Sequence, residues 1–239
     1  MSAPILLIAN LAGGSAKTTT ASAIATASAE YGKNVLAIDA DPAATLTFLC
    51  GIENPRMTTH EVSRGDFSFQ NAVVKTAERY SLIPGASRAM DGDLDWNWIS
   101  SAAEDFDLIV VDTPSGPTRT LLDIAPLVNA VVIPTENSFL SLRGALHVKE
   151  FLHSVQNDGS ARANIETSLL PVKCDGLSAE FVALMKDRFS IIEPAIRVDQ
   201  SVPDAEISMR SVLTSAPQSG AASDYREVTY AILEKVGIF

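Results

Sequence analysis

The chain contains few of the residues on which disulfide-bonded, metal-cluster and membrane proteins depend. Its two cysteines, Cys50 and Cys174, lie far apart and form no Cys-x-x-Cys pair, which argues against a zinc or iron–sulfur site held within one chain. We expect both to be small, reduced core residues. No apolar run approaches the roughly 18 residues of a transmembrane helix. Residues 1–4 lead directly into an apolar run without the basic segment of a signal peptide, so we expect a cytoplasmic protein.

Positively charged residues are also scarce. Lysine and arginine total 18 against 29 aspartate and glutamate residues, which gives a formal net charge of −11. Proteins that hold DNA by phosphate contacts need clustered basic side chains, and a global acidic field opposes the approach of a polyanion. The last apolar helical pattern, residues 222–236, lacks the basic face of a membrane-surface helix, so we expect it to pack in the core and to bind no membrane. Nonspecific DNA binding stays an open alternative, since a local basic face on a dimer can outweigh the average charge.

A loop of small residues joins the first apolar run, residues 5–9, to an alanine-rich helical pattern that begins at Lys17. Small residues let a loop wrap so closely that successive backbone N–H groups point at phosphate oxygens, and the helix N-terminus adds free donors and its positive dipole end. Lys17 is then placed to reach the β- and γ-phosphate oxygens, and the Thr18 hydroxyl to bind Mg²⁺. The residues expected to contact the nucleotide are Gly13, Gly14, Ser15, Ala16, Lys17, Thr18 and Thr19.

Two substitutions separate this loop from the strict Gly-x-x-x-x-Gly-Lys-Ser/Thr pattern of phosphate-binding loops. Leu11 and Ala16 stand where that pattern has its two glycines. If the backbone has a positive φ at residue 16, the alanine Cβ costs on the order of 1 kcal/mol there. We therefore expect Ala16 to weaken or slow the site without destroying it.

Three aspartates stand at the ends of two further apolar runs. Asp39 and Asp41 follow the second apolar run of the chain, and Asp112 follows the run at residues 106–111. In a doubly wound α/β sheet, ligands bind outside the carboxyl ends of the strands, so these carboxylates and Lys17 are expected to meet in one crevice. A carboxylate at the end of a buried strand is costly to leave unpaired, and a Mg²⁺-linked water is a natural partner for Asp112.

The order of the apolar segments predicts the fold. Length and composition fit one domain, residues 1–239. Alternating strand and helix patterns indicate a three-layer α/β fold, a doubly wound and mostly parallel sheet with helices on both faces. Strands are expected at residues 5–9, 35–38, 80–83, 106–111, 130–133, 165–172 and 191–192. Helices are expected at residues 17–31, 45–49, 94–103, 118–128, 139–156 and 222–236, and residues 51–69 are expected to form loop and a short helix.

These motifs resemble those of the deviant Walker A ATPases of the ParA/MinD family, which segregate plasmids and chromosomes or position large cargoes. Residues 13–19 are similar to the family's Lys-Gly-Gly-x-Gly-Lys-Thr-Thr loop except at Ala16, and residues 35–42 and 106–114 resemble its second strand and its Walker B strand. Further segments that resemble the family are residues 113–117, its switch II loop, residues 131–134 followed by Gly144, and residues 220–225. The resemblance spans nearly the whole chain and implies a P-loop NTPase fold.

The resemblance also implies that the chain binds ATP and Mg²⁺. In the family, the carboxylate that matches Asp41 positions or activates the attacking water, and the one that matches Asp39 helps to form the Mg²⁺ shell. Lys17 and Asp41 are thus the expected catalytic residues, and Thr18, Asp39 and Asp112 the expected metal-binding residues. The alternative for Asp39 and Asp41 is that either caps the helix that comes after it.

The chain departs from the family at its signature lysine. That lysine would fall at position 12, where this sequence has Ala12. In the family it crosses a nucleotide-sandwich dimer and neutralises phosphate charge on the partner's ATP. Some relatives, notably in the carboxysome-positioning branch, also lack it and use a lysine from later in the chain. Lys149 and Arg143 are the candidates for such a nucleotide-binding substitute here, and the alternative is that both lie on a solvated helix face.

The resemblance implies an ATPase that dimerises on ATP, hydrolyses it slowly, and uses this switch to partition plasmid or chromosomal DNA or to position another large cargo. Its expected partners are a second copy of the chain and a cargo adaptor, ParB-like or of another kind. The alternative is a degenerate nucleotide-binding module that interacts with a partner and hardly hydrolyses ATP. Ala12 and Ala16 are the residues that favour this alternative.

Overall fold

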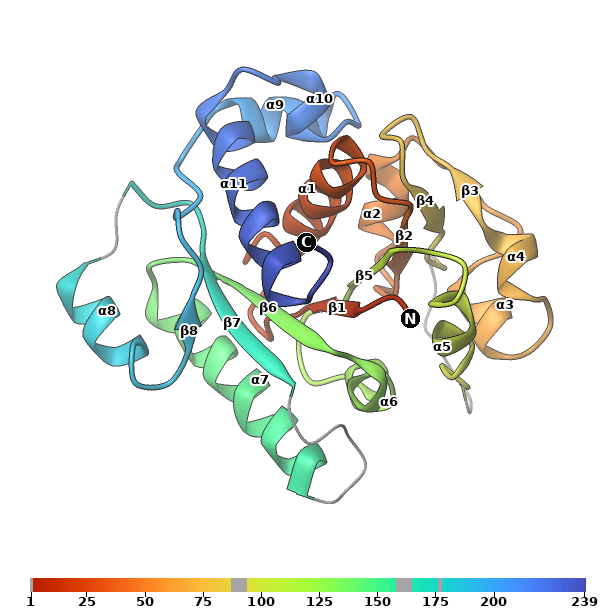
Figure 1. Ribbon diagram of the computed structural model, residues 1–239, viewed down its shortest axis with the longest axis horizontal. Helices are drawn as coiled ribbons and strands as arrows, with labels where there is room; N and C mark the ends of the chain where they lie inside the picture. Colours follow the sequence, from red (N-terminus) through yellow and green to blue (C-terminus); the bar gives the residue numbers. More distant parts are fainter. Residues whose placement is uncertain (1, 87–93, 158–164, 176–177) are drawn as a thin grey trace.

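One eight-stranded sheet runs through the protein (Figure 1). The computed structural model describes residues 2–86, 94–157, 165–175 and 178–239. The strands are β1 (Ile5–Ile8), β2 (Val35–Asp39), β3 (Val74–Lys75), β4 (Ser81–Ile83), β5 (Leu108–Asp112), β6 (Ala130–Thr135), β7 (Glu166–Pro171) and β8 (Ser190–Ile191). Their order in the sheet is β3-β4-β2-β5-β1-β6-β7-β8. Every neighbouring pair is parallel except β3 with β4.

Helices cover both faces of this sheet, which makes the three layers expected from the sequence. They are α1 (Lys17–Glu30), α2 (Thr45–Leu49), α3 (Thr59–Ser63), α4 (Phe69–Ala72), α5 (Trp98–Ala102), α6 (Arg119–Ile124), α7 (Phe139–Asn157), α8 (Ala179–Met185), α9 (Ser201–Ile207), α10 (Val212–Ser215) and α11 (Gly220–Lys235), with a 3₁₀ turn η1 (Ala125–Leu127) after α6. Helices α3 to α8 pack with one core cluster, and α1, α2 and α9 to α11 pack with another. In the part of the chain that the structure describes, no helix has both the length and the apolar character needed to cross a membrane.

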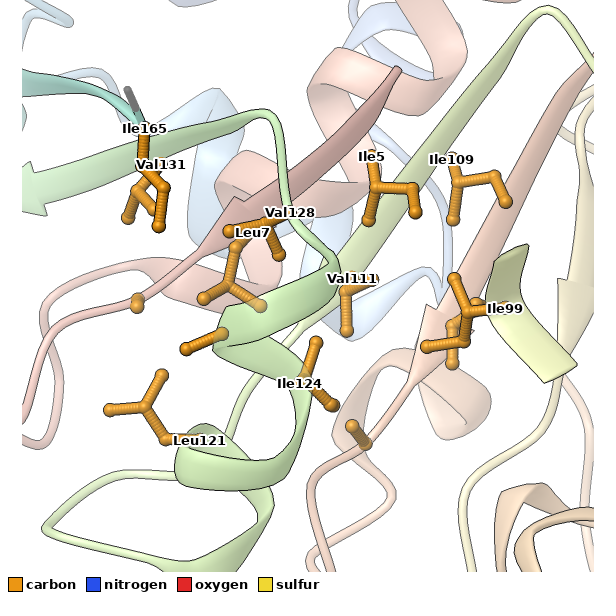
Figure 2. Packing of buried hydrophobic residues seen from close by; sticks show 14 of the residues in the cluster. Ile5, Leu7, Ile99, Ile109, Val111, Leu121, Ile124, Val128, Val131 and Ile165 are labelled. Carbon is orange, nitrogen blue, oxygen red and sulfur yellow. The ribbon is translucent and has the colours of Figure 1, made fainter. Parts of the chain in front are cut away.

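The alternation of side chains along β1 explains why there are two core clusters. Ile5 and Leu7 belong to the cluster that contains α6 and α7, whereas Leu6 and Ile8 belong to the cluster that contains α1 and α11. Successive side chains of a strand point to opposite faces, so a strand covered on both faces needs an unbroken apolar run. Figure 2 shows the first cluster, with side chains of α6 packed over β1 and β5.

Helix α1 is buried on nearly all sides, which fixes the position of the loop before it. The sheet lies under α1 and α11 runs alongside it, and the buried stretch of α1 consists almost entirely of alanine, serine and threonine. Such small side chains let α1 pack closely against both the sheet and α11, although the helix has no broad apolar stripe. The loop that ends at Ala16 is therefore held by a helix that has little freedom to move.

The structure confirms the fold class and the order of the long elements, and the expected strands differ from the observed ones only at their ends. The helix expected at residues 94–103 starts too early, because it begins at Trp98. Before it, the Asp95 carboxylate accepts hydrogen bonds from the backbone and the side chain of Asn97, a local turn that competes with helix. The elements that the sequence does not predict are β3, α4, α8, α9 and α10, which are too short to show a clear period.

Candidate functional site

The carboxyl ends of the central strands place the expected site residues at one edge of the sheet. In the parallel register, Asp112 on β5 lies opposite Ile8 on β1 and opposite Asp39 on β2. Strand β1 continues into a loop, residues 9–16, and α1 begins directly after it at Lys17. The strand order thus brings Lys17, Asp39 and Asp112 to one place.

The loop at residues 9–16 leaves the first turn of α1 with free backbone donors. Gly14 has φ of 73°, and Ala16, the residue before the helix, has φ of 62° and ψ of 29°. This left-handed backbone costs a residue with a Cβ on the order of 1 kcal/mol, so the strain expected at Ala16 is present. Among the described residues, no side chain caps the N-terminus of α1. Its first N–H groups are therefore available to an anion.

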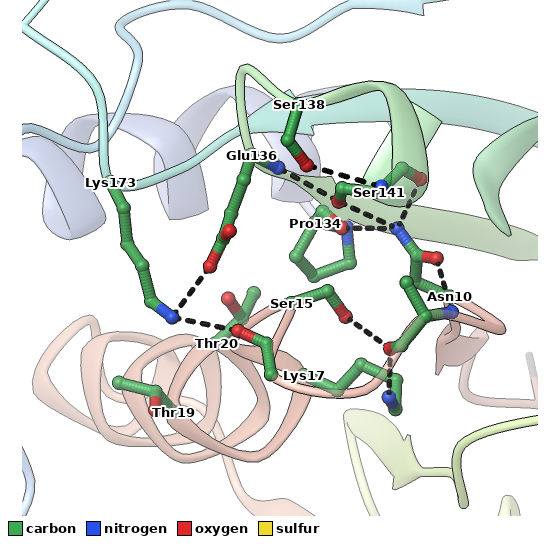
Figure 3. Close-up of polar contacts among 12 residues, drawn as sticks. Asn10, Ser15, Lys17, Thr19, Thr20, Pro134, Glu136, Ser138, Ser141 and Lys173 are labelled. Atoms are coloured by element: carbon green, nitrogen blue, oxygen red, sulfur yellow. Dashed lines mark hydrogen bonds and ion pairs between the residues drawn. The ribbon is translucent and has the colours of Figure 1, made fainter. Parts of the chain in front are cut away.

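Asn10 fastens this loop to the neighbouring strand and helix. Its side chain is buried, and Nδ2 donates hydrogen bonds to the Pro134 carbonyl at 2.8 Å and to the Ser141 carbonyl at 3.2 Å. Its Oδ1 accepts from the Ala12 N–H at 2.9 Å. Figure 3 shows these bonds joining the loop at residues 9–16 to the end of β6 and to the first turn of α7. A buried amide with partners for both of its polar atoms holds the loop in one conformation.

Lys17 lies in the mouth of the loop. Its Nζ donates to the Ser115 hydroxyl at 2.8 Å and to the Ala12 carbonyl at 3.2 Å. Burial lowers the pKa of Lys17, and the nearby carboxylates of Asp112 and Asp41 oppose that shift. Ser115 belongs to the segment after β5, so the lysine connects the loop at residues 9–16 to a second loop at the same edge.

Asp112 is a buried carboxylate that the protein leaves poorly compensated. Among the described residues, neither carboxylate oxygen has a hydrogen-bond partner of good geometry, although the Thr18 hydroxyl lies beside it. Burial raises the pKa of Asp112 well above its usual range, repulsion from Asp39 adds to the shift, and Thr18 and Lys17 oppose it. A carboxylate in such surroundings costs free energy unless a cation or donors reach it.

The surroundings of Asp112 fit a magnesium ion. Mg²⁺ binds oxygen ligands and is commonly held by one or two protein groups together with water and substrate phosphates. The Asp112 carboxylate and the Thr18 hydroxyl are oxygen groups of that kind. Within the described ranges, no cluster of three or more histidine, cysteine, aspartate and glutamate side chains could hold a metal ion.

Asp39 and Asp41 have different surroundings. The Asp39 carboxylate is buried and accepts from the Thr47 N–H at 2.8 Å and from the Thr47 hydroxyl at 2.6 Å. Thr47 lies in the first turn of α2, so these contacts match the alternative in which Asp39 caps the following helix. The role of Asp39 in the Mg²⁺ shell stays a prediction. Burial raises the pKa of Asp39 to about 6. Asp41 is half-buried, and its Oδ1 accepts from the Ala43 N–H at 2.8 Å.

A cavity of about 880 Å³ opens beside the loop and the start of α1. It is lined by all the residues expected to contact the nucleotide except Gly13, and by Asp41. Lys173 and residues of a segment that begins at Ile196 also line it. The sequence does not predict Lys173, although its position directly after the apolar run that forms β7 places it at the same edge of the sheet.

A second cavity, of about 900 Å³, lies between the loop, α6 and α7, and we call it the α6–α7 groove. Arg143 and Ala12 both line it. Lys149 faces elsewhere, because its Nζ donates to the Arg188 carbonyl and lies over the ring of Phe189 at 4.9 Å from the centroid. Of the two candidates for a substitute cation, the structure brings Arg143 and not Lys149 to the loop.

Comparison with known proteins shows the family of the chain. The family model for the AAA domain matches residues 3–167. The chain is 27% identical to an uncharacterized ATP-binding protein of Methanocaldococcus jannaschii, over 95% of this chain and 87% of that protein. It is 30% identical to the maintenance of carboxysome distribution protein A of Gloeothece citriformis, over 84% of each chain. Other relatives are chromosome-partitioning proteins of Thermus thermophilus and Caulobacter vibrioides.

A similar solved structure contains a nucleotide. Cobyrinic acid a,c-diamide synthase of Mycobacterium smegmatis, with a bound ATP analogue and magnesium, superposes with a TM-score of 0.82 at 25% identity. The alignment covers 98% of this chain and 96% of that one. The fold found here is thus one that holds an ATP analogue and magnesium in a similar protein.

Proposed function

The chain belongs to the AAA domain family, and on that premise we propose that it is a ParA/MinD-type ATPase, one domain spanning residues 1–239, that switches with ATP. It binds ATP with Mg²⁺, dimerises on the nucleotide, hydrolyses it slowly and uses the cycle to partition DNA or to position another large cargo. A cargo adaptor, ParB-like or of another kind, links the ATPase to that cargo. Relatives named for carboxysome distribution and for chromosome partitioning support this proposal.

The buried carboxylate of Asp112 is the observation that carries the proposal. A structural aspartate at this depth has donors around it, as Asp39 has from Thr47. Asp112 has instead the Thr18 hydroxyl, the nearby ammonium group of Lys17 and a helix N-terminus. These are the surroundings of a carboxylate that shares its charge with a metal-bound nucleotide.

Phosphoryl transfer in this site rests on positioning and on charge neutralisation. The backbone N–H groups of the loop and the Lys17 ammonium hold the β- and γ-phosphates. Thr18 and Asp112 would hold Mg²⁺, which would supply further neutralisation of phosphate charge. Asp41, half-buried on the wall of the cavity, orients the attacking water. Because Lys17 also contacts Ser115, a phosphate that draws the ammonium away releases the loop after β5.

A nucleotide-sandwich dimer must offset the repulsion between its two triphosphates. Two ATP molecules bring together roughly eight formal negative charges, which a low-dielectric interface screens poorly. Residue 12 supplies no cation, since it is an alanine. Arg143 is exposed on α7 and lines the same groove as Ala12, so we assign it the cation that the loop lacks, acting on the nucleotide across the dimer.

A second candidate function is a nucleotide-binding interaction module with little hydrolysis. The left-handed backbone at Ala16 favours it, because a strained residue next to Lys17 misplaces the phosphates more easily than a glycine does. Ala12 favours it too, since a dimer without the signature cation is weaker. The two candidates share the binding site and differ in whether the bound ATP drives dimerisation and is hydrolysed.

Calorimetric titration with ATP and Mg²⁺ tests the shared site. Lys17→Ala removes the cation in the loop mouth and should abolish measurable binding. Lys75→Ala removes the same charge from β3, at the far edge of the sheet, and should bind as the wild type does. Unchanged affinity in Lys17→Ala would sink the assignment of the site.

Asp41→Ala separates the two candidate functions. If Asp41 orients the attacking water, this variant should bind ATP, hydrolyse none and accumulate as a dimer in light scattering. The wild type should release phosphate slowly and dimerise on a nonhydrolysable analogue, with and without nonspecific DNA as two arms of the same experiment. A wild type that binds ATP but neither hydrolyses it nor dimerises is the interaction module.

A further inference from the structure

The nucleotide cavity contains a lysine that the proposed mechanism does not use. Lys173 follows β7 and the isolated bridge between Val172 and Ile196. Its Nζ donates to the Gly14 carbonyl at 2.7 Å and forms an ion pair with the Glu136 carboxylate at 2.6 Å. Figure 3 shows the ammonium group bonded to Glu136 and to the loop below it. A residue far along the chain is thus tied directly to the loop at residues 9–16.

The other basic side chains on the cavity wall are already engaged. Arg197 donates to both carboxylate oxygens of Asp224, at 2.8 and 2.6 Å, which neutralises its charge. Lys17 occupies the loop mouth on the Ser115 side. Among the described lining residues, Lys173 is therefore the cation that a bound nucleotide could still recruit to the loop.

The main chain holds Lys173 in this place at a cost. Its φ is 52°, in the left-handed region that disfavours a residue with a Cβ. Backbone of this kind persists where the surroundings fix it, and it is common at ligand-binding clamps. The side chain itself is 53% exposed, so its long flexible stem can turn from one partner to another without first being dehydrated.

We propose that Lys173 binds the nucleotide phosphates within its own subunit and so supplies a second cation to a loop that has Ala12 in place of lysine. The inference rests on the proposed ATP site. An ammonium group has three donors, so Lys173 can keep the Gly14 carbonyl and exchange Glu136 for a phosphate oxygen. A triphosphate carries several negative charges where Glu136 carries one, which favours the exchange. Glu136 then competes with the nucleotide for the same cation.

The competition gives the two partners opposite effects on ATP affinity. Lys173→Ala removes a charge-assisted hydrogen bond to phosphate and should weaken ATP·Mg²⁺ binding on the order of tenfold. Glu136→Gln removes the competing carboxylate and should tighten binding about two- to fivefold. Lys173→Arg keeps the charge and should retain most of the affinity. The loss in Lys173→Ala should be larger for ATP than for AMP and should shrink as salt is added.

A purely structural ion pair predicts a different pattern. If Lys173 only braces the loop through Gly14, Glu136→Gln weakens binding with Lys173→Ala or leaves it unchanged, and either result overturns the inference. Unchanged ATP affinity in Lys173→Ala overturns it as well. Lys75→Ala is the charge-matched control, and thermal unfolding of each variant without nucleotide shows whether it has folded.

Lys17→Ala distinguishes a failure of this inference from a failure of the proposed function. If Lys17→Ala binds ATP normally, the site itself is misassigned. If Lys17→Ala abolishes binding while Lys173→Ala has no effect, the site stands and only the role of Lys173 falls.

Discussion

Gly144 on α7 lies so close to Asn10 that a Cβ at position 144 would be 2.2 Å from the Asn10 Oδ1. The same Cβ would be 2.7 Å from the backbone nitrogen of Ala12. Helix α7 reaches the loop at residues 9–16 only because residue 144 has no side chain.

Gly144→Ala should therefore destabilise the protein, against the usual trend for helices. An alanine in a helix interior is normally more stable than glycine by about 1 kcal/mol. Here the loop must shift to admit the methyl group, so we expect a loss of about 1–3 kcal/mol in the free energy of unfolding and weaker ATP binding. Denaturant titration and calorimetry measure the two effects. Ser154→Ala, on the exposed side of the same helix, should change stability by less than about 0.5 kcal/mol.

Ala16→Gly should stabilise the nucleotide-free protein. The left-handed backbone at residue 16 destabilises the folded protein by about 1–2 kcal/mol when the residue is alanine, and glycine removes this strain. Glycine also gives the unfolded chain more conformational entropy, which offsets part of the stabilisation. We expect a net increase of about 0.5 kcal/mol in the free energy of unfolding. Ala29→Gly, in the last turn of α1, should instead lose up to about 1 kcal/mol. Equal losses in both variants would contradict the strain assigned to Ala16.

The buried carboxylates predict a stability that falls as pH rises. Burial raises the pKa of Asp112 well above its usual range and that of Asp39 to about 6. A carboxyl group with a higher pKa in the folded protein than in the unfolded chain binds more protons when folded. Its contribution is fully present below the unfolded pKa near about 4 and is lost as pH rises through the folded pKa.

Asp112→Asn tests whether the ionised carboxylate lowers the stability of the folded protein. Removing an uncompensated buried charge should raise the free energy of unfolding of the nucleotide-free protein by about 1–3 kcal/mol near neutral pH, with a smaller gain in mild acid. Asp39→Asn should lower stability instead, because both carboxylate oxygens of Asp39 accept hydrogen bonds, one from Thr47 and the other from the Asp41 N–H, and an amide leaves only one acceptor. Urea titrations across the pH range, without nucleotide, measure both. A loss of stability in Asp112→Asn would mean that the carboxylate has structural partners.

The sequence predicts those parts of the site that a local sequence pattern marks. Lys17 and Thr18 follow a loop of small residues, and Asp112 ends an apolar run, so local pattern and the carboxyl-edge rule are enough to bring them together. The sequence does not predict the contacts of Asn10 and Lys173, because their partners are distant in sequence. Asn10 bonds to Pro134 on β6, and Lys173 bonds to Gly14 and to Glu136. Which strands flank β1 in the sheet is a tertiary fact that residue spacing does not encode.

Tertiary packing also explains why only one of the two candidate cations on α7 lies near the loop. Arg143 and Lys149 lie six positions apart on one helix, and the sequence treats them alike. Tertiary packing gives the two residues different surroundings. Helix α7 contacts the loop at Gly144, next to Arg143, whereas the Lys149 ammonium donates a hydrogen bond to a carbonyl in the segment after α8. The sequence does not predict the short helices α9 and α10, because a run of a few residues shows no clear hydrophobic periodicity.

Arg143→Ala and Lys149→Ala should differ in ATP-dependent dimerisation. Arg143 is exposed on the α6–α7 groove next to Ala12, so its loss leaves the phosphate charge in the dimer without that cation. We expect dimerisation on a nonhydrolysable ATP analogue to weaken at least about tenfold, as when one partner of a buried charge pair is removed. Lys149→Ala should dimerise as the wild type does, because its ammonium is bonded to the Arg188 carbonyl.

Restoring the missing lysine completes the comparison. Ala12→Lys placed in the Arg143→Ala background returns a cation to the position from which the ParA/MinD signature lysine acts, and dimerisation should partly recover in analytical ultracentrifugation. The opposite pattern, with dimerisation lost in Lys149→Ala and kept in Arg143→Ala, would mean that α7 turns or moves on binding ATP and that the cation comes from its other side. Loss of dimerisation in neither variant would place the compensating charge within the subunit, where Lys173 already contacts the loop.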